Sequence, residues 1–320
     1  MKEGKGGAPG VRVVEIDASR GGQRIDNFLL TLFKGVPRSH VYRLLRTGQV
    51  RVNKGRIKPT YRLNPGDRVR IPPVGQAESL PIRLDDARRA AIEAAVIYED
   101  ADLMVLDKPA GMAVHGGSGL RFGLIEALKE MRPAWPDISL VHRLDRFTSG
   151  CLLVAKNRAF LPALQEQLRT DRVEKRYLTL VKGRWQGGPR TVTLSLHKGR
   201  LLSGERMVQV DEEEGKEAES RFIPIEVHDG ASLMQVVIRT GRMHQIRVHA
   251  AGIGHPVAGD EKYGDPEFNR RMRELGLKRI FLHAQVLSFD HPRSGQPMTL
   301  SAPLPDNLRQ VLHNVGDRFI

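Results

Sequence analysis

The sequence has a single cysteine, few aromatic residues and no long apolar run, and each shortage excludes a class of protein. One cysteine, Cys151, cannot form an internal disulfide, so an oxidising compartment is not indicated. No stretch approaches the ~18 consecutive apolar residues that a membrane helix needs. Residues 1–10 lack the apolar core of a secretory signal, and we expect them to form a flexible tail. These shortages predict a soluble, cytoplasmic protein.

The positive charge of the chain is concentrated at its N-terminal end. With 320 residues, 40% of them hydrophobic, the chain is long and apolar enough for two folded domains. Residues 1–75 hold 16 Lys and Arg against 5 Asp and Glu, which accounts for +11 of the net charge of +14. The alternative is a basic surface that only contacts solvent, but such a surface gives no reason for the positive charge to be concentrated in about one quarter of the chain. The charge therefore indicates a polyanion-binding module joined to a nearly neutral body.

The basic region, residues 11–75, has the pattern of two short helices and small strands. Hydrophobic spacing, caps and turn residues predict the boundaries. The predicted elements are a strand at 11–16, a helix at 24–33, a helix from a cap at Ser39 to a stop at Gly48, a strand at 50–53, a turn at Lys54–Gly55 and a strand at 66–71. The second helix has one apolar face and one basic face.

These elements, with basic residues at their junctions, resemble the alpha-L RNA-binding domain, which was first known from a ribosomal protein. The resemblance runs through residues 22–26, 51–54 and 66–67. It implies that the second helix and the turn after it face RNA through shape and phosphate contacts. The residues expected to contact RNA are Arg24, Lys34, Arg38, Ser39, Arg43, Arg46, Arg51, Asn53, Lys54 and Lys58.

The rest of the chain predicts one α+β body at residues 96–320, reached through a linker at 76–95 that runs into a short helix at 85–95. Many short strand patterns with helices at irregular intervals favour a mixed or antiparallel sheet. Strands are predicted at 96–100, 103–107, 151–155, 174–181, 190–196, 219–227, 233–239 and 281–289, helices at 124–131 and 158–170 and within 240–250, and a closing hairpin at 290–301.

Three polar clusters in this body, at 142–150, 240–249 and 254–264, are candidate sites. In the first cluster, Asp145 lies between Arg143 and Arg146 and just before an apolar strand. An aspartate in this position is ionised at neutral pH. It can act as a nucleophile, a base, a metal ligand or a salt-bridge partner.

Several common chemistries lack their motifs in this chain. His244 and His249 are five residues apart, which a helix does not place together as metal ligands, and no second cysteine is available. Ser149 is not in the Gly-x-Ser-x-Gly elbow of a hydrolase. No dinucleotide fingerprint and no phosphate-binding loop follow a predicted strand. These shortages disfavour metal, hydrolase and nucleotide sites.

Taken together, the clusters resemble pseudouridine synthases of the branch that modifies ribosomal and transfer RNA. The resemblance is carried by His142-Arg143-Leu144-Asp145-x-x-Thr148-Ser149-Gly150, by Gly241-Arg242-x-His244-Gln245-Ile246-Arg247-x-His249, and by Gly254-His255-Pro256 with Gly259-Asp260. Lys108-Pro109-x-Gly111, Lys175-x-Tyr177 and Leu282-His283-Ala284 also match, in the family's order. The match spans about residues 96–303 and implies a mixed, mainly antiparallel central sheet with flanking helices.

This resemblance implies a role for each residue of a uridine site. Asp145 is expected to be the essential carboxylate, which either attacks a carbon or removes a proton from the sugar. Arg247 is expected to pair with Asp145 and orient it. Tyr177 is expected to stack on the uracil, and Arg143 to fill the space that the uridine vacates.

The remaining expectations concern the pocket walls and the histidines. Ile246 and Leu282 are expected to be apolar pocket walls. His142, His244 and His249 are expected to hold loops by hydrogen bonds rather than transfer protons. The isomerisation needs no metal, nucleotide or redox cofactor, which fits the missing motifs.

The expected partner is large-subunit ribosomal RNA or its assembly intermediate, and no oligomerisation signal is visible, so we expect a monomer. A synthase that acts on transfer RNA is one alternative. A non-catalytic RNA-binding factor of ribosome assembly is another.

Overall fold

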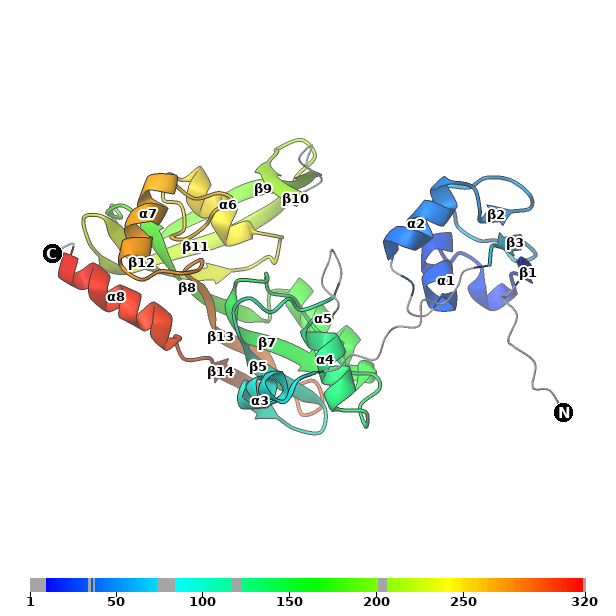
Figure 1. Ribbon diagram of the computed structural model, residues 1–320, viewed down its shortest axis with the longest axis horizontal. Helices are drawn as coiled ribbons and strands as arrows, with labels where there is room; N and C mark the ends of the chain where they lie inside the picture. The colour runs from blue at the N-terminus through cyan, green and yellow to red at the C-terminus, as the bar shows by residue number, and fades with distance from the viewer. Residues whose placement is uncertain are drawn as a thin grey trace. The chain divides into compact units, whose positions relative to one another are not determined.

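A computed structural model of the chain describes residues 10–33, 36, 38–73, 84–116, 122–200 and 206–318 (Figure 1). The chain divides into two compact units, Met1–Arg83 and Leu84–Ile320. Within these ranges the structure describes only the backbone of Ser19, Arg38, Ser39, Arg158, Lys198, Arg200 and Arg206. Of the predictions above, the Lys34 contact and residues 1–9 of the tail lie outside the described residues.

The first unit combines two helices with a three-stranded antiparallel sheet of order β1-β3-β2. Phe28 and Leu29 of the first helix and Leu44 of the second are buried in one core with Val69 and Ile71 of the sheet, as the hydrophobic spacing predicted. The elements are β1 (Arg12–Glu15), the 3-10 turn η1 (Ala18–Arg20), α1 (Ile25–Leu32), α2 (Arg38–Arg46), β2 (Arg51–Val52) and β3 (Arg68–Ile71).

Two local predictions in this unit are wrong. Helix α2 begins at Arg38, so Ser39 lies inside the helix and is not its cap. The left-handed residues after β2 are Asn53 (φ 48°) and Lys54 (φ 69°), so the turn lies one residue earlier than predicted. The side chain of Asn53 stabilises this turn, because its Nδ2 donates to Asp67 Oδ1 at 2.8 Å and its Oδ1 accepts from Arg68 N at 2.9 Å.

The described part of the second unit is built on a mixed sheet of eleven strands. Its main path is β10-β9-β11-β12-β8-β13-β7-β5-β4, with β14 beside β13 and β6 beside β7. Among the described strands of this sheet, only β13 and β7 pair in parallel. The predicted α+β fold with a mainly antiparallel sheet is confirmed. The strands are β4 (Val96–Glu99), β5 (Leu103–Lys108), β6 (Ser139–Leu140), β7 (Ser149–Ala155), β8 (Glu174–Lys182), β9 (Arg190–Arg200), β10 (Arg206–Val210), β11 (Lys216–Val227), β12 (Ala231–Ile238), β13 (Leu282–Asp290) and β14 (Pro297–Ser301).

Helices cover this sheet, and two of them were not predicted (Figure 1). Helix α7 begins at an Asp-Pro pair, where Asp265 Oδ1 accepts from Phe268 N at 2.7 Å. Phe268 of α7 and Val311 of α8 are buried in one core with Leu180 of β8 and Leu233 of β12. The helices and turns are α3 (Asp86–Ala94), α4 (Leu124–Met131), η2 (Arg158–Phe160), α5 (Leu161–Arg169), α6 (Gln245–Gly252), α7 (Pro266–Glu274) and α8 (Asp306–Arg318). The division at Leu84 places α3 in the second unit, whereas the predicted linker extended to residue 95.

Strands β7 and β13 approach each other unusually closely where they begin. Gly150 has a φ of 108°, and a Cβ at this position would lie 2.1 Å from the carbonyl oxygen of Ala284. No side chain fits there, so glycine is required for the parallel pairing.

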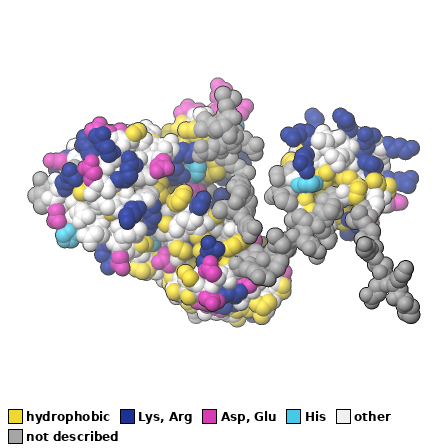
Figure 2. All heavy atoms as spheres, viewed as in Figure 1, with side chains coloured by type: hydrophobic (Ala, Val, Ile, Leu, Met, Phe, Trp, Pro, Cys, Tyr) yellow, Lys and Arg dark blue, Asp and Glu magenta, His cyan; other side chains and the backbone are white. Residues whose placement is uncertain are grey.

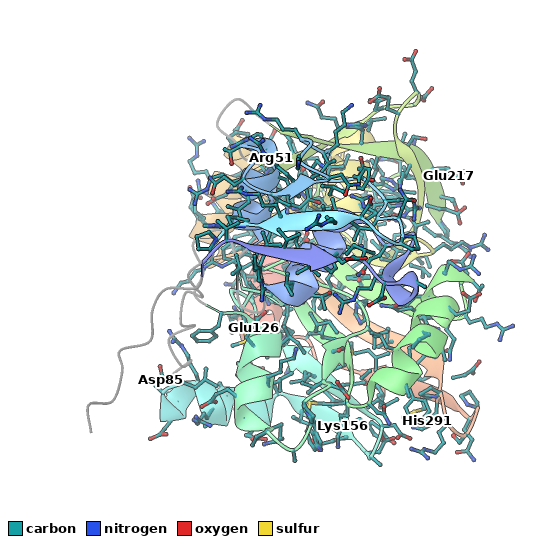
Figure 3. All side chains as sticks on the ribbon, turned by 90° about the vertical axis from the view of Figure 1, so that its right-hand side faces the viewer. Arg51, Asp85, Glu126, Lys156, Glu217 and His291 are labelled. Atoms are coloured by element: carbon teal, nitrogen blue, oxygen red, sulfur yellow. The ribbon has the colours of Figure 1, made fainter. Side chains whose placement is uncertain are left out.

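The far ends of β7 and β13 are joined by polar contacts around Asp100. Lys156, directly after β7, donates to the carbonyl oxygen of Asp100 and lies 3.0 Å from Glu99. His291, directly after β13, lies 2.9 Å from the carboxylate of Asp100. Figure 3 shows Lys156 and His291 at the same edge of the second unit. Both strands are therefore anchored at this end, while their opposite ends frame the pocket described next.

Candidate active site

An open pocket lies where β7 and β13 begin. Loop residues that precede β7 form one wall, and the start of α6 forms another. The pocket brings together all of the predicted uridine-site residues, which come from distant parts of the sequence. These are Arg143, Asp145, Tyr177, Ile246, Arg247 and Leu282.

Buried polar contacts from the end of β5 and the turn after it hold the loop that carries Asp145. Lys108, which is fully buried, donates through Nζ to the carbonyl oxygens of Pro109, Met112 and Arg146 at 2.9, 3.0 and 3.2 Å. Gly111 N donates to Arg146 O at 2.8 Å, and Arg146 Nε donates to Gly111 O at 3.0 Å. Burial lowers the pKa of Lys108 to about 7. These contacts fix the backbone next to Asp145.

Neither neighbouring arginine pairs with Asp145. Arg146 faces Gly111 and lies over the ring of Phe147. Arg143 is exposed, and its side chain has no polar partner within the described part of the chain. Asp145 therefore does not form an ion pair with either arginine of its own loop.

Arg247 approaches Asp145 but is bound more tightly to Asp260. Its Nη1 lies 3.7 Å from Asp145 Oδ2, whereas its Nε and Nη2 donate to the two carboxylate oxygens of Asp260 at 2.7 Å each. Burial alone would raise the pKa of Asp260, but the hydrogen bonds from Arg247 and from the backbone N–H groups of Lys262 and Tyr263 lower it. The bidentate pair fixes the guanidinium in a plane beside Asp145.

Tyr177 lies on β8 and is 7% exposed. Burial and, secondly, the charge of Asp145 raise the pKa of its phenol. The side chain is therefore the neutral phenol at neutral pH, with its ring at the wall of the pocket.

The three histidines differ in what they contact. His142 Nε2 accepts from Leu153 N at 3.0 Å, and burial lowers the pKa of His142 to about 4. His244 Nδ1 lies 2.9 Å from Tyr263 Oη, and its Nε2 lies 3.8 Å from Asp145 Oδ2. His249 is fully buried and neither ring nitrogen has a hydrogen-bond partner in the described structure. The prediction that His249 holds a loop by hydrogen bonds is therefore wrong.

The predicted RNA-contacting residues of the first unit divide into those that support its internal structure and those whose side chains are exposed. Arg24 forms a bidentate pair with the buried Asp26, at 3.1 and 2.7 Å. The amide of Asn53 is occupied by its turn, and Arg51 Nε donates to Gly48 O at 3.1 Å. These three side chains have internal structural roles.

Four other predicted cations are exposed in this unit: Arg43, Arg46, Lys54 and Lys58. Figure 2 shows Lys and Arg side chains along the edge of the first unit, with few Asp or Glu among them on that face. Arg38 and Ser39 belong to α2, on the same basic helix as Arg43 and Arg46. This surface is suited to a polyanion.

One group of side chains outside the pocket has spacing that suits a metal ion. Ligand atoms of His197, Asp211 and Glu214 lie within 4.8 Å of one another. Asp211 Oδ1 is already used, because it accepts from the backbone N–H groups of Glu213 and Glu214. None of the three ligand residues lines the pocket, so this group has no part in the candidate site.

Comparison with known proteins shows the family of the chain. Residues 102–252 match the RNA pseudouridylate synthase family, and residues 23–69 match the S4 domain. The ribosomal large subunit pseudouridine synthase C of Haemophilus influenzae is 50% identical to this chain over 96% of each protein. The chain belongs to the RNA pseudouridylate synthase family. The predicted family, fold and enzyme class, an isomerase, are confirmed.

Other relatives of this pseudouridylate synthase agree with the assignment. Proteins of the same description from Escherichia coli K12 and Salmonella typhimurium are 50% and 51% identical over 96% of this chain, and the matches cover 97% and 98% of those proteins. The solved structure of human RNA pseudouridylate synthase domain containing 1 has a TM-score of 0.54 and 26% identity, covering 66% of this chain and 83% of that one. Human RNA pseudouridylate synthase domain containing 4, with a TM-score of 0.59, 22% identity and coverage of 72% and 96%, shares the fold.

Two residues that support the pocket were not among the predicted site residues. Asp260, which the sequence shows only as part of a motif, binds Arg247, and Tyr263 contacts both Arg247 and His244. The sequence did contain a signal for both residues, because Asp260 and Tyr263 lie in the same polar cluster, 254–264, as the family-matching Gly254 and Gly259.

Proposed function

We propose that this pseudouridylate synthase isomerises specific uridines of large-subunit ribosomal RNA to pseudouridine, with Asp145 as the essential carboxylate and without a cofactor. The supporting observation is the 50% identity, over nearly the whole of both chains, to ribosomal large subunit pseudouridine synthase C. The residues at the pocket are of the right types for this reaction. A cytoplasmic monomer is part of the same proposal. Within the described part of the chain, no helix has the length and apolarity to cross a membrane.

The reaction breaks the bond between C1′ of the ribose and N1 of the uracil and forms a bond between C1′ and C5. The proton at C5 leaves for solvent and N1 gains one, so no electrons are exchanged with an outside group. Asp145 takes part by adding to a carbon or by taking a proton from the sugar. Arg247, fixed by Asp260, places positive charge beside the carboxylate.

The uridine must leave its helical stack to enter the pocket, which costs a few kcal/mol. Stacking on the ring of Tyr177 contributes about 1–3 kcal/mol and offsets much of that cost. Ile246 and Leu282 supply apolar walls. Arg143, exposed and without a polar partner in the described structure, is free to occupy the space left in the RNA.

The first unit supplies RNA affinity in this proposal. We assign residues 11–75 to RNA binding and 96–320 to catalysis, joined by residues 76–95, of which α3 belongs to the compact second unit. The exposed cations Arg43, Arg46, Lys54 and Lys58 are the expected phosphate contacts.

The decisive experiment compares wild type with Asp145→Asn on unmodified large-subunit ribosomal RNA. Because the hydrogen at C5 is lost, tritium placed at C5 of uridine is released into water, and mapping pseudouridine then locates the product. We expect release by wild type and a loss of roughly 1,000-fold or more in the variant, because the reacting carboxylate is absent. Asp137→Asn, an exposed aspartate outside the pocket, is the matched control. Inactive wild type, or equal activity in Asp145→Asn, refutes the proposal, and transfer RNA as the better substrate refutes its ribosomal part.

The RNA-binding role is tested by replacing Arg43, Arg46, Lys54 and Lys58 with glutamine. Each lost phosphate contact should reduce the slope of log affinity against log salt by about 1, while kcat at saturating RNA stays within a few-fold of wild type. The matched control replaces four exposed cations of the second unit, Lys129, Arg270, Arg273 and Arg309. An unchanged salt slope in the first variant would remove the RNA-binding role from this surface.

A further inference from the structure

His244 occupies a strained backbone position at the pocket, directly before α6. Its φ of 56° and ψ of 18° lie in the left-handed region, which costs free energy for a residue with a side chain. Such a conformation persists only where the surrounding contacts enforce it. The side chain is 15% exposed and lines the pocket, so the contacts of its ring identify what the strain achieves.

Tyr263 determines which nitrogen of His244 carries the proton. The backbone N–H of Val208 donates to Tyr263 Oη at 2.9 Å, so this oxygen already accepts one hydrogen bond. The phenol proton then needs an acceptor, and His244 Nδ1, 2.9 Å away, is the acceptor that the described residues place there. Burial lowers the pKa of His244 to about 4, so the ring is neutral at neutral pH. A neutral ring that accepts at Nδ1 carries its proton on Nε2.

The nitrogen that carries this proton lies near one particular oxygen of Asp145. His244 Nε2 lies 3.8 Å from Oδ2, and Arg247 Nη1 lies 3.7 Å from the same Oδ2. In both pairs Oδ2 is the oxygen of Asp145 that lies nearest to the donor. The two oxygens of the carboxylate are therefore not equivalent, because both donors converge on one of them.

The donors themselves are fixed by a common set of residues. Asp260 holds the guanidinium of Arg247 through two hydrogen bonds of 2.7 Å. Tyr263 lies under the same guanidinium, 5.0 Å from its carbon to the ring centroid, while its hydroxyl holds His244. A shift of Tyr263 would therefore displace both donors at once.

We propose that His244 is a positioning residue for Asp145: with Arg247 it holds Oδ2, so that Oδ1 is the oxygen presented to the uridine. Tyr263 directs the Nε2 proton that makes this possible. The inference rests on the proposed role of Asp145 as the essential carboxylate. A neutral N–H donor orients the carboxylate without adding a second full charge, which would make it a weaker base and nucleophile. Misplacement of a reacting group by about 1 Å can cost on the order of 100-fold in rate.

Two substitutions of His244 separate positioning from a structural role. Asparagine tolerates the left-handed backbone well but its short side chain cannot donate toward Asp145. Glutamine tolerates that backbone less well but places an amide N–H near the position of Nε2. A structural role predicts that His244→Asn is the more active variant, whereas positioning predicts that His244→Gln is.

The experiment measures tritium release from C5-labelled ribosomal RNA at saturating and at limiting concentrations of RNA, with urea unfolding of each variant. We expect kcat to fall on the order of 100-fold in His244→Asn and about tenfold less severely in His244→Gln, with KM within about threefold of wild type in both. His244→Asn that is as active as His244→Gln, or a loss confined to KM, overturns the inference.

Tyr263→Phe gives a second test that does not depend on the stability of the His244 variants. It removes one oxygen and should lower kcat at least about tenfold, because Nδ1 is no longer held as an acceptor and the Nε2 lone pair can face the carboxylate. Wild-type kcat in Tyr263→Phe overturns the inference. Inactive wild type refutes the proposed function as well, whereas active wild type with inactive Asp145→Asn leaves that function standing whatever the His244 variants do.

Discussion

Replacing His249 with leucine should make the second unit less sensitive to acid. The imidazole is fully buried, and neither nitrogen has a hydrogen-bond partner in the described structure. Burial lowers the pKa of His249 from 6.5 to about 4. Between these values the unfolded chain binds a proton that the folded chain does not bind, so the free energy of unfolding falls as the pH falls from about 6.5 to 4.

The size of this effect follows from the two pKa values. At pH 5 the linkage removes about 2 kcal/mol of stability for this one histidine, and at pH 7 it removes only about 0.2 kcal/mol. Leucine has no proton to bind. The change in unfolding free energy between pH 7 and pH 5 should therefore be about 2 kcal/mol smaller in His249→Leu than in wild type.

Urea unfolding followed by tryptophan fluorescence measures this difference in the second unit alone, because Trp135 and Trp185 are the only tryptophans of the chain. Gln310→Leu is the matched control, since it replaces an exposed polar side chain of α8 that does not titrate. Its change between the two pH values should match that of wild type. An equal change in His249→Leu and wild type would show that the buried ring takes up a proton in the folded state, and would refute the reasoning.

Two further predictions concern residues that shape the pocket. Gly150→Ala should destabilise the second unit by about 3 kcal/mol or more, because its methyl group would meet the Ala284 carbonyl oxygen at 2.1 Å, whereas Gly188→Ala, with nothing within 4 Å, should have little effect in the same urea assay. Lys108→Met should lower the free energy of unfolding by about 3 kcal/mol, because three carbonyl oxygens lose their shared donor. It should also lower kcat by displacing the backbone next to Asp145. Wild-type stability and rate would contradict this role.

Local patterns in the sequence were sufficient for most helices and strands. The helix predicted at 124–131 is α4, and the apolar run from Cys151 lies within β7, where all residues are buried. Helix α8 was missed although Leu308, Val311 and Val315 follow helical spacing. Strand β10 was missed because its residues show little apolar alternation, and its pairing with β9 decides its conformation.

The candidate site was predictable in its membership but not in its internal contacts. Matching motifs identified Asp145, Tyr177 and Arg247, and all three line one pocket. That Arg247 binds Asp260 more closely than Asp145 depends on how the loop after α6 folds back against the helix, which no local pattern records. For the same reason, the unpartnered nitrogens of His249 were not foreseeable, since motif membership says nothing about hydrogen-bond partners.

The junction at β13 has a consequence for the order of folding. Ser149 and His283 face each other across the parallel pair although 134 residues separate them in the chain, and the pocket draws one wall from each side of this junction. Contacts between such distant segments form slowly, because the intervening chain must be closed into a loop first. Neither side of the sheet alone contains the complete pocket. The pocket is thus completed late, and a nascent chain that lacks β13 has Asp145 without the strand that completes it.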